Sequence, residues 1–214
     1  MIKFLIKVSI VSSYIVMLTA CSSTAQTNDS RPVQTVQKGI QQYTEGESIV
    51  DIPLAYKDQL KVLETVKGKV THVKDGDTID VKVNGEKQAV RLLLLDTPES
   101  VSQKIPPQKM GKEASSFLKK QLEGKSVTMV YDRGPKEDKY GRKLAYVFCE
   151  GIHINELMVK SGYGIIAYIS KPSTTLLPQM LEAEKEAKVS KIGVWSIKGY
   201  VDEAKRHYNR NDAA

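Results

Sequence analysis

Residues Val66–Asp96 read VKGKVTHVKDGDTIDVKVNGEKQAVRLLLLD. In this segment, β-branched and apolar residues alternate with polar ones or form short runs, which is the pattern of β-strands. Asp75-Gly76-Asp77 interrupts the pattern once and Asn84-Gly85 interrupts it again. Asn-Gly between two such runs is the strongest short-range hairpin signal. The segment therefore predicts three strands in a meander, and its four leucines predict a buried strand.

The pattern changes to a helical period after the meander. Gly111 to Leu122 places its apolar residues on one face and its lysines elsewhere, which predicts a helix. Two strand-like runs follow, KSVTMVYD (125–132) and KLAYVFCEG (143–151), and then two helical segments, INELMVKSG (154–162) and residues 176–190. Five short strands interrupted by one helix predict an α+β fold: a five-stranded OB-type β-barrel with three flanking helices.

The N-terminus has the features of an export signal. Lys3 and Lys7 precede an apolar stretch that is too short to cross a membrane comfortably, and small residues follow before Cys21. Leu18-Thr19-Ala20-Cys21 resembles the bacterial lipobox, so we expect residues 1–20 to be removed and Cys21 to carry lipid. An ordinary signal peptide with a chance cysteine is the alternative. The expected location is the extracytoplasmic face of the cell membrane, with a released, secreted form left open.

The rest of the chain divides by composition. Residues 21–65 are predicted to be the lipidated cysteine and a flexible tether rich in Ser, Thr and Gln, although residues 50–65 are apolar enough to dock on the domain or begin it. Residues 66–196 form the predicted domain. Residues 197–214 are predicted to be a polar, frayed C-terminal tail.

Composition limits the function classes. The 214 residues are 41% hydrophobic, which excludes a disordered protein, and 32 basic residues against 25 acidic ones give a net charge of +7. Such a balance suits an anionic partner, either nucleic acid or an acidic membrane surface. With Cys21 lipidated, Cys149 has no partner for an intramolecular disulfide. His72, His153 and His207 have no metal-ligand spacing, so zinc chemistry has little support.

Charged residues gather at the ends of the predicted strands. Asp77, Asp96 and Glu99 offer carboxylate oxygens, the ligands that Ca²⁺ and Mg²⁺ prefer. Arg91 and Arg142 offer planar guanidinium groups that match phosphate oxygens. Together they predict a phosphodiester-cleaving site. Two simpler interpretations stay open here: the aspartates could only stabilise turns, and the whole set could be a surface salt-bridge network.

The motifs DGDT, RLLLLDTPE and DKYGRKLAY, followed by AYISKP and GVWS, resemble the thermonuclease family, the staphylococcal-nuclease-like calcium nucleases, from about Gly68 to Trp195. Members of that family cut DNA and RNA and leave 3′-phosphates. The resemblance implies metal ligands for Ca²⁺ (Asp77, Asp96 and the carbonyl of Thr97), phosphate contacts and a general base (Arg91, Arg142 and Glu99), and substrate contacts (Lys139, Tyr140 and Tyr168). The chain departs from the family at Ser170, where a second tyrosine is common.

These observations lead to an expected function and two alternatives. We expect a calcium-dependent endonuclease acting on DNA and RNA, monomeric and with no obligate protein partner. A catalytically inactive OB-type module that binds nucleic acid is the first alternative, and a lipoprotein that adheres to acidic envelope polymers is the second. Retention of all five charged site residues favours the nuclease.

Overall fold

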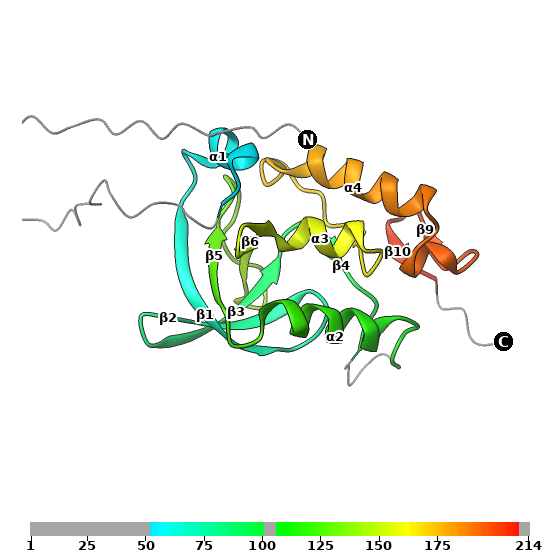
Figure 1. The fold of residues 1–214 in the computed structure, drawn as a ribbon, viewed down its shortest axis with the longest axis horizontal. Coiled ribbons are helices and arrows are strands. Elements are labelled where there is room, and N and C mark those ends of the chain that lie inside the picture. The colour runs from blue at the N-terminus through cyan, green and yellow to red at the C-terminus, as the bar shows by residue number, and fades with distance from the viewer. Residues whose placement is uncertain (1–51, 101–105, 210–214) are drawn as a thin grey trace, which may run out of the picture. The chain divides into compact units, whose positions relative to one another are not determined.

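Five strands form a closed β-barrel in the computed structural model, which describes residues 52–100 and 106–209 (Figure 1). The barrel strands are β1 (Thr65–Val73), β2 (Thr78–Val83), β3 (Glu86–Leu92), β5 (Ser126–Val130) and β6 (Lys143–Cys149). They follow the order β3-β2-β1-β5-β6, and parallel pairing of β3 with β6 closes the barrel. The short strand β7 (Ile152–His153) pairs with β6. The predicted OB-type α+β fold is therefore confirmed.

The predicted hairpin lies at Asn84-Gly85, between β2 and β3. Both residues have positive φ, 49° at Asn84 and 92° at Gly85, which is the backbone of a type I′ turn. Val83 is paired directly with Glu86 across the turn. Because this turn fixes the register, Val81 and Val90 lie in the core while alternate residues face outward.

The four leucines do not form one continuous strand, so that part of the prediction is wrong. Strand β3 ends at Leu92, Leu93 and Leu94 form a turn in which Leu94 has φ 57°, and Leu95 begins β4 (Leu95–Asp96). Strand β4 pairs with β8 (Ile165–Ile166). All four leucines are buried, and the buried Asn155 amide donates to the Leu93 carbonyl over 2.9 Å. Apolar burial was therefore predicted correctly, but the turn depends on a distant side chain.

Three predicted helices are confirmed, as α2 (Gly111–Leu122), α3 (Ile154–Lys160) and α4 (Leu177–Val189). Helix α2 lies beside the barrel and buries Ala114, Leu118 and Leu122 (Figure 1). Helices α3 and α4 pack against each other, and Met158 and Met180 are fully buried. Within the described part of the chain, no helix is both long and apolar enough to span a membrane.

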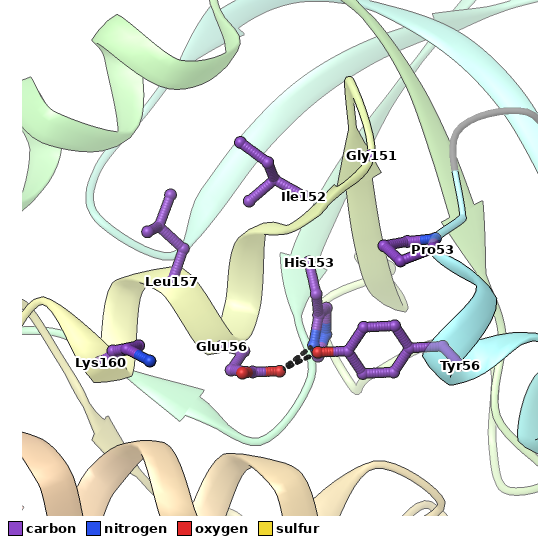
Figure 2. Close-up of a pocket in the computed structure, with 8 residues that line it drawn as sticks. All are labelled: Pro53, Tyr56, Gly151, Ile152, His153, Glu156, Leu157 and Lys160. Carbon is purple, nitrogen blue, oxygen red and sulfur yellow. Dashed lines mark hydrogen bonds and ion pairs between the residues drawn. The ribbon is translucent and has the colours of Figure 1, made fainter.

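A fourth helix, α1 (Leu54–Leu60), begins the domain earlier than predicted. Ile52 and Leu60 are buried, and the Tyr56 ring contacts Phe148 edge-on with centroids 5.6 Å apart. Figure 2 shows the Tyr56 hydroxyl, which donates a hydrogen bond to Glu156. The prediction of a flexible tether as far as residue 65 is therefore wrong for residues 52–65, because their apolar side chains find partners on the barrel. The signal peptide, Cys21 and the tether to residue 51 lie outside the described residues.

The segment after Trp195 folds back onto the domain. It follows the short helix η1 (Gly193–Ser196) and forms a small hairpin of β9 (Val201–Asp202) and β10 (His207–Tyr208). Tyr200 and Tyr208 are buried against Ile165 and Val194. The prediction of a frayed tail is therefore wrong for residues 197–209, since two tyrosines anchor an otherwise polar segment.

Candidate active site

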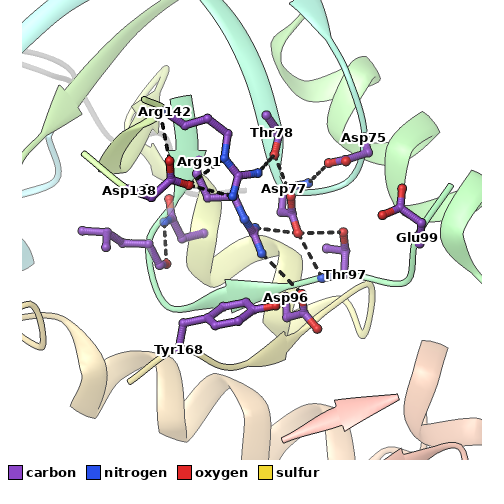
Figure 3. A network of polar contacts seen from close by, with 12 residues as sticks. Asp75, Asp77, Thr78, Arg91, Asp96, Thr97, Glu99, Asp138, Arg142 and Tyr168 are labelled. Atoms are coloured by element: carbon purple, nitrogen blue, oxygen red, sulfur yellow. Dashed lines mark hydrogen bonds and ion pairs between the residues drawn. The ribbon is translucent and has the colours of Figure 1, made fainter. Parts of the chain in front are cut away.

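One arginine and two aspartates form the centre of the site (Figure 3). The register of β2 and β3 pairs Thr78 with Arg91, so Arg91 lies beside the residue that precedes β2, Asp77. The Arg91 Nη1 atom is 2.5 Å from Asp77 Oδ2, and Nη2 is 3.3 Å from Asp96 Oδ1. The turn at Leu93-Leu94 thus returns the chain so that Asp96 faces the arginine five residues before it.

Further hydrogen bonds orient Asp77. The Thr97 backbone N–H and hydroxyl both donate to Oδ2 over 3.3 Å, and the Thr78 hydroxyl donates to Oδ1 over 2.9 Å. The Asp77 N–H itself donates to Asp75 Oδ1, so Asp75 stabilises the turn as its sequence context suggested. The side chains of Arg91 and Asp77 are only 10% and 9% exposed. Such burial excludes the interpretation of this pair as a surface salt bridge.

The site holds an excess of negative charge. Burial raises the pKa of Asp77 far above its ordinary value, against the attraction of Arg91, and the neighbouring Asp75 and Asp96 raise it further. Burial also raises the pKa of Asp96. Carboxylates that repel one another in a buried place are stabilised by an added cation.

The second arginine, Arg142, lies just before β6 and is held by Asp138. Its Nε and Nη2 atoms both lie 2.7 Å from Asp138 Oδ2. Its Nη1 donates to the Thr78 hydroxyl over 3.3 Å. Burial alone would raise the pKa of Asp138, but hydrogen bonds from Arg142 and from the Tyr140 backbone outweigh it and lower that pKa. Parallel pairing of Arg91 with Leu144 brings the two arginines to neighbouring strands.

Glu99 is positioned through its backbone. Its N–H donates to the Gln108 side-chain oxygen over 2.7 Å, and the Gln108 N–H donates back to the Glu99 carbonyl over 2.8 Å. Gly111 at the start of α2 leaves room for this carbonyl, because a Cβ there would lie 2.4 Å from it. In Figure 3 the Glu99 carboxylate points toward the side of the site where Asp75 and Thr97 lie.

Two exposed tyrosines stand beside the arginines. The Tyr168 hydroxyl donates to Asp96 Oδ1 over 3.3 Å, and the Arg91 guanidinium lies 5.4 Å from the centre of its ring. The Tyr140 ring lies 5.5 Å from the Arg142 guanidinium and 5.1 Å from the Lys139 ammonium. Both rings are over 70% exposed, so a base or sugar can reach them. The structure therefore brings the predicted substrate residues to the same place as the predicted charged ones.

The donor atoms at this site suit a hard divalent cation. Asp77, Asp96 and the Thr97 carbonyl would supply oxygen ligands, and the mutual repulsion of the aspartates is what a cation would relieve. Among the described residues, however, no three His, Cys, Asp or Glu side chains are grouped closely enough to form a metal site. Asp77 Oδ2, one of the oxygens that would contact the cation, forms an ion pair with Arg91 and accepts a hydrogen bond from the Thr97 N–H.

Sequence reasoning missed four residues that support the site, namely Thr78, Gln108, Asp138 and Tyr208. Asp138 carries a detectable signal, since it precedes Arg142 by four residues in the quoted motif DKYGR. Tyr208 carries none: its hydroxyl donates to the Asp96 carbonyl over 2.8 Å from 112 residues away. Only the folded C-terminal hairpin reveals that contact.

Comparison with known proteins agrees with this geometry. A family model described as Staphylococcal nuclease homologue matches residues 89–197. An uncharacterized protein of Bacillus anthracis is 78% identical over 99% of this chain and 100% of its own length. Endonuclease YncB of Bacillus subtilis is 41% identical over 59% of this chain and 60% of its own length. A thermonuclease of Staphylococcus hyicus is 39% identical over 60% of this chain and 75% of its own.

Proposed function

Because this chain belongs to the staphylococcal nuclease homologue family, we propose that it is a calcium-dependent endonuclease that hydrolyses DNA and RNA to 3′-phosphate products. The family model and the relatives named endonuclease and thermonuclease support a phosphodiester-hydrolysing nuclease. The observation that carries the proposal is the placement of Arg91 on β3 and of Arg142 directly before β6, the two strands that close the barrel, beside buried aspartates.

The two arginines would hold the reacting phosphate. A guanidinium presents two parallel N–H donors to phosphate oxygens and keeps its charge at every physiological pH. Ion pairs of Arg91 with Asp77 and Asp96, and of Arg142 with Asp138, fix where the guanidinium planes lie. Groups held in place before substrate binds stabilise the charge that develops on the phosphate in the transition state without a reorganisation cost.

Glu99 would accept the proton of the attacking water. Its backbone is fixed by Gln108, and it follows the metal-ligand candidates Asp96 and Thr97 by two to three residues. A bound Ca²⁺, held by Asp77, Asp96 and the Thr97 carbonyl, would supply Lewis-acid charge stabilisation. Exposed Tyr140, Tyr168 and Lys139 would contact base, sugar and backbone without selecting a sequence.

The test is hydrolysis of single-stranded DNA and of RNA by the purified chain, with Ca²⁺ and with EGTA. We expect hydrolysis only with Ca²⁺, and we expect Glu99→Gln and Arg142→Ala to lose on the order of a hundredfold or more in kcat. Glu182→Gln, on the exposed side of α4, is the matched control and should keep full activity. Variants at Glu99 and Arg142 that retained wild-type turnover would show that the active site is elsewhere.

The assay also separates the alternatives. Binding of nucleic acid without cleavage in Ca²⁺ would support an inactive OB-type module. Neither binding nor cleavage would support adhesion to acidic polymers. The presence of both arginines, Glu99 and the aspartates argues against an inactive module. Burying charged groups costs free energy, and a module that only binds nucleic acid would not need to bury them.

We further propose that the mature chain is a monomer anchored through a lipid on Cys21 at the extracytoplasmic face of the membrane. The support is the lipobox-like sequence Leu18-Thr19-Ala20-Cys21. Mass spectrometry of the mature N-terminus tests it: a diacylglyceryl-modified Cys21 is expected. An unmodified N-terminus created at another position would refute the anchor and leave the nuclease proposal intact.

A further inference from the structure

Lysines lie directly opposite one another on the outer face of the β1–β2–β3 meander. The register pairs Lys69 with Lys82 and Lys82 with Lys87, so the three form a row across adjacent strands, here called the lysine row. All three side chains are exposed. The neighbouring pair Val70 and Val81 faces the core, as the two-residue period of strands requires.

The placement of three lysines opposite one another lowers the stability of the sheet. Like charges directly opposite each other on neighbouring strands repel and destabilise the sheet. Within the described part of the chain, neither Lys69 nor Lys82 forms an ion pair, and Lys87 pairs with Asp80 over 2.7 Å. Asp80 is itself only 2% exposed and is shared with Lys74 over 2.9 Å. The acid is therefore neutralised beneath two lysines, and the outer face stays positive.

The lysine row and Arg91 lie on one face of the same hairpin. On β3, Lys87 and Arg91 are four residues apart and therefore point to the same side, and on β2 the same holds for Lys82 and Thr78. Four strand residues span about 13 Å. Asp80 lies between the row and the arginine, but its charge is matched by Lys74 and Lys87. Among the residues that the structure describes, the face between the row and Arg91 therefore carries no unpaired negative charge.

We propose that the lysine row binds the sugar-phosphate backbone of the nucleic acid strand several nucleotides away from the phosphate held by Arg91 and Arg142. This inference rests on the proposed nuclease function. A distance of about 13 Å corresponds to roughly four nucleotides at 3.4 Å per nucleotide. Lysine ammonium groups contact phosphates as point charges and read no base, so the row would strengthen binding of any sequence.

An acidic membrane surface is the other anion that a basic face attracts. The nucleic acid is favoured because the row lies on the same face as Arg91, four residues from it along β3. Binding to a membrane would not require the lysine row to be in register with Arg91, whereas binding to a nucleic acid strand held by Arg91 would.

The test compares Lys69→Gln/Lys82→Gln with a control that removes the same charge elsewhere, Lys191→Gln/Lys198→Gln. Both control lysines are exposed and flank η1 in the sequence, between α4 and β9, which Figure 1 shows away from β2 and β3. Binding of a 5′-labelled oligodeoxynucleotide of about 20 nucleotides is measured with EDTA at several salt concentrations. In the row variant we expect affinity on the order of tenfold weaker at low salt and a salt slope shallower by about 1.4, while the control stays near wild type.

A second pair of measurements guards against a misfolded variant and against failure of the proposed function. Lys69→Arg/Lys82→Arg keeps the charge and should keep the affinity. With Ca²⁺, the row variant should cleave a trinucleotide at the wild-type rate but show a raised KM on the long strand. Because binding is measured without metal, an inactive enzyme would refute the nuclease and leave the lysine row testable.

Three results would overturn the inference. They are unchanged affinity of the row variant for the long oligonucleotide, equal losses in the row and control variants, and a loss confined to vesicles of phosphatidylglycerol. The last would assign the face to the membrane instead.

Discussion

The hydroxyl of Tyr208 donates a hydrogen bond of 2.8 Å to the backbone carbonyl of Asp96. The C-terminal hairpin thereby holds β4, the strand that presents an aspartate to Arg91. Tyr208 is buried, and its ring lies 5.3 Å from that of Tyr200, whose hydroxyl donates to the Lys109 carbonyl. Two tyrosines of a polar segment thus support both sides of the loop that carries Glu99.

Replacing Tyr208 with phenylalanine should harm activity more than stability. Loss of one hydrogen bond lowers the free energy of unfolding by about 1 kcal/mol. Removing a group that supports a metal ligand costs roughly tenfold to a hundredfold in activity, and for Asp96, the metal ligand that we propose, we expect about tenfold. Urea unfolding and initial rates of DNA hydrolysis measure the two effects. Tyr56→Phe, which removes a hydroxyl bonded to Glu156, is the control and should leave the rate unchanged.

Removing Arg91 should destabilise the fold, because Asp77 then stays buried without the cation that favours its charged form. Arg91→Ala is expected to lower the free energy of unfolding by about 3–5 kcal/mol. The double variant Asp77→Ala/Arg91→Ala should lose less than the sum of the two single changes, since neither charge is then left alone. Denaturant unfolding of the wild type, Asp77→Ala, Arg91→Ala and the double variant gives the double-mutant cycle. Additive losses would mean that the pair is not coupled.

Gly111→Ala should reduce activity without touching a charged group. The new Cβ would lie 2.4 Å from the Glu99 carbonyl, so the backbone of Glu99 must move. Misplacement of a reacting group by about 1 Å costs up to roughly a hundredfold in rate. Ser116→Ala, an exposed position of the same helix, is the control. Full activity of the glycine variant would mean that the position of Glu99 is not critical.

Stability should fall in mild acid because of His153. Burial lowers the pKa of His153, despite the favourable effect of Glu156 at 3.3 Å, so the unfolded chain binds a proton more readily than the native one (Figure 2). The stabilisation is complete above the unfolded pKa of about 6.5 and is lost as the pH falls below it, by up to about 1.4 kcal/mol per pH unit. Urea unfolding at pH 7.5, 6.5 and 5.5 measures this loss.

His153→Phe provides the matched comparison, because the imidazole stacks on Phe148 with centroids 4.8 Å apart and a phenyl ring can take its place. This variant should show a flatter dependence between pH 6.5 and 5.5. The lowered pKa of Glu156 acts only at more acidic pH. A wild-type protein with constant stability across this window would contradict the assignment to His153.

Local signals made most of the barrel predictable. Asn84-Gly85 fixed one hairpin because few residue pairs tolerate two positive φ angles, and the helical period of residues 111–122 was clear. The break at Leu94 was not predictable, since four leucines fit a strand equally well and the turn depends on Asn155 far along the chain. The charged site residues were predicted by type, but the support of Asp96 by Tyr208 follows from tertiary contact alone.

Composition misled at both ends of the domain. Residues 50–65 were apolar enough to leave docking open but not to predict it, and residues 197–209 are largely polar; a few buried anchors, including Leu60 and Tyr200, are enough to hold both segments. Average hydrophobicity does not detect single anchors, because their burial depends on a cavity that other segments provide.

The parallel pairing of β3 with β6 has a consequence for biosynthesis. The two arginines meet only where those strands meet, and about fifty residues separate Arg91 from Arg142. A growing polypeptide that lacks its sixth strand therefore cannot bring together the two arginines that we propose hold the phosphate. On that proposal, hydrolysis of nucleic acid requires the strand pairing that closes the barrel.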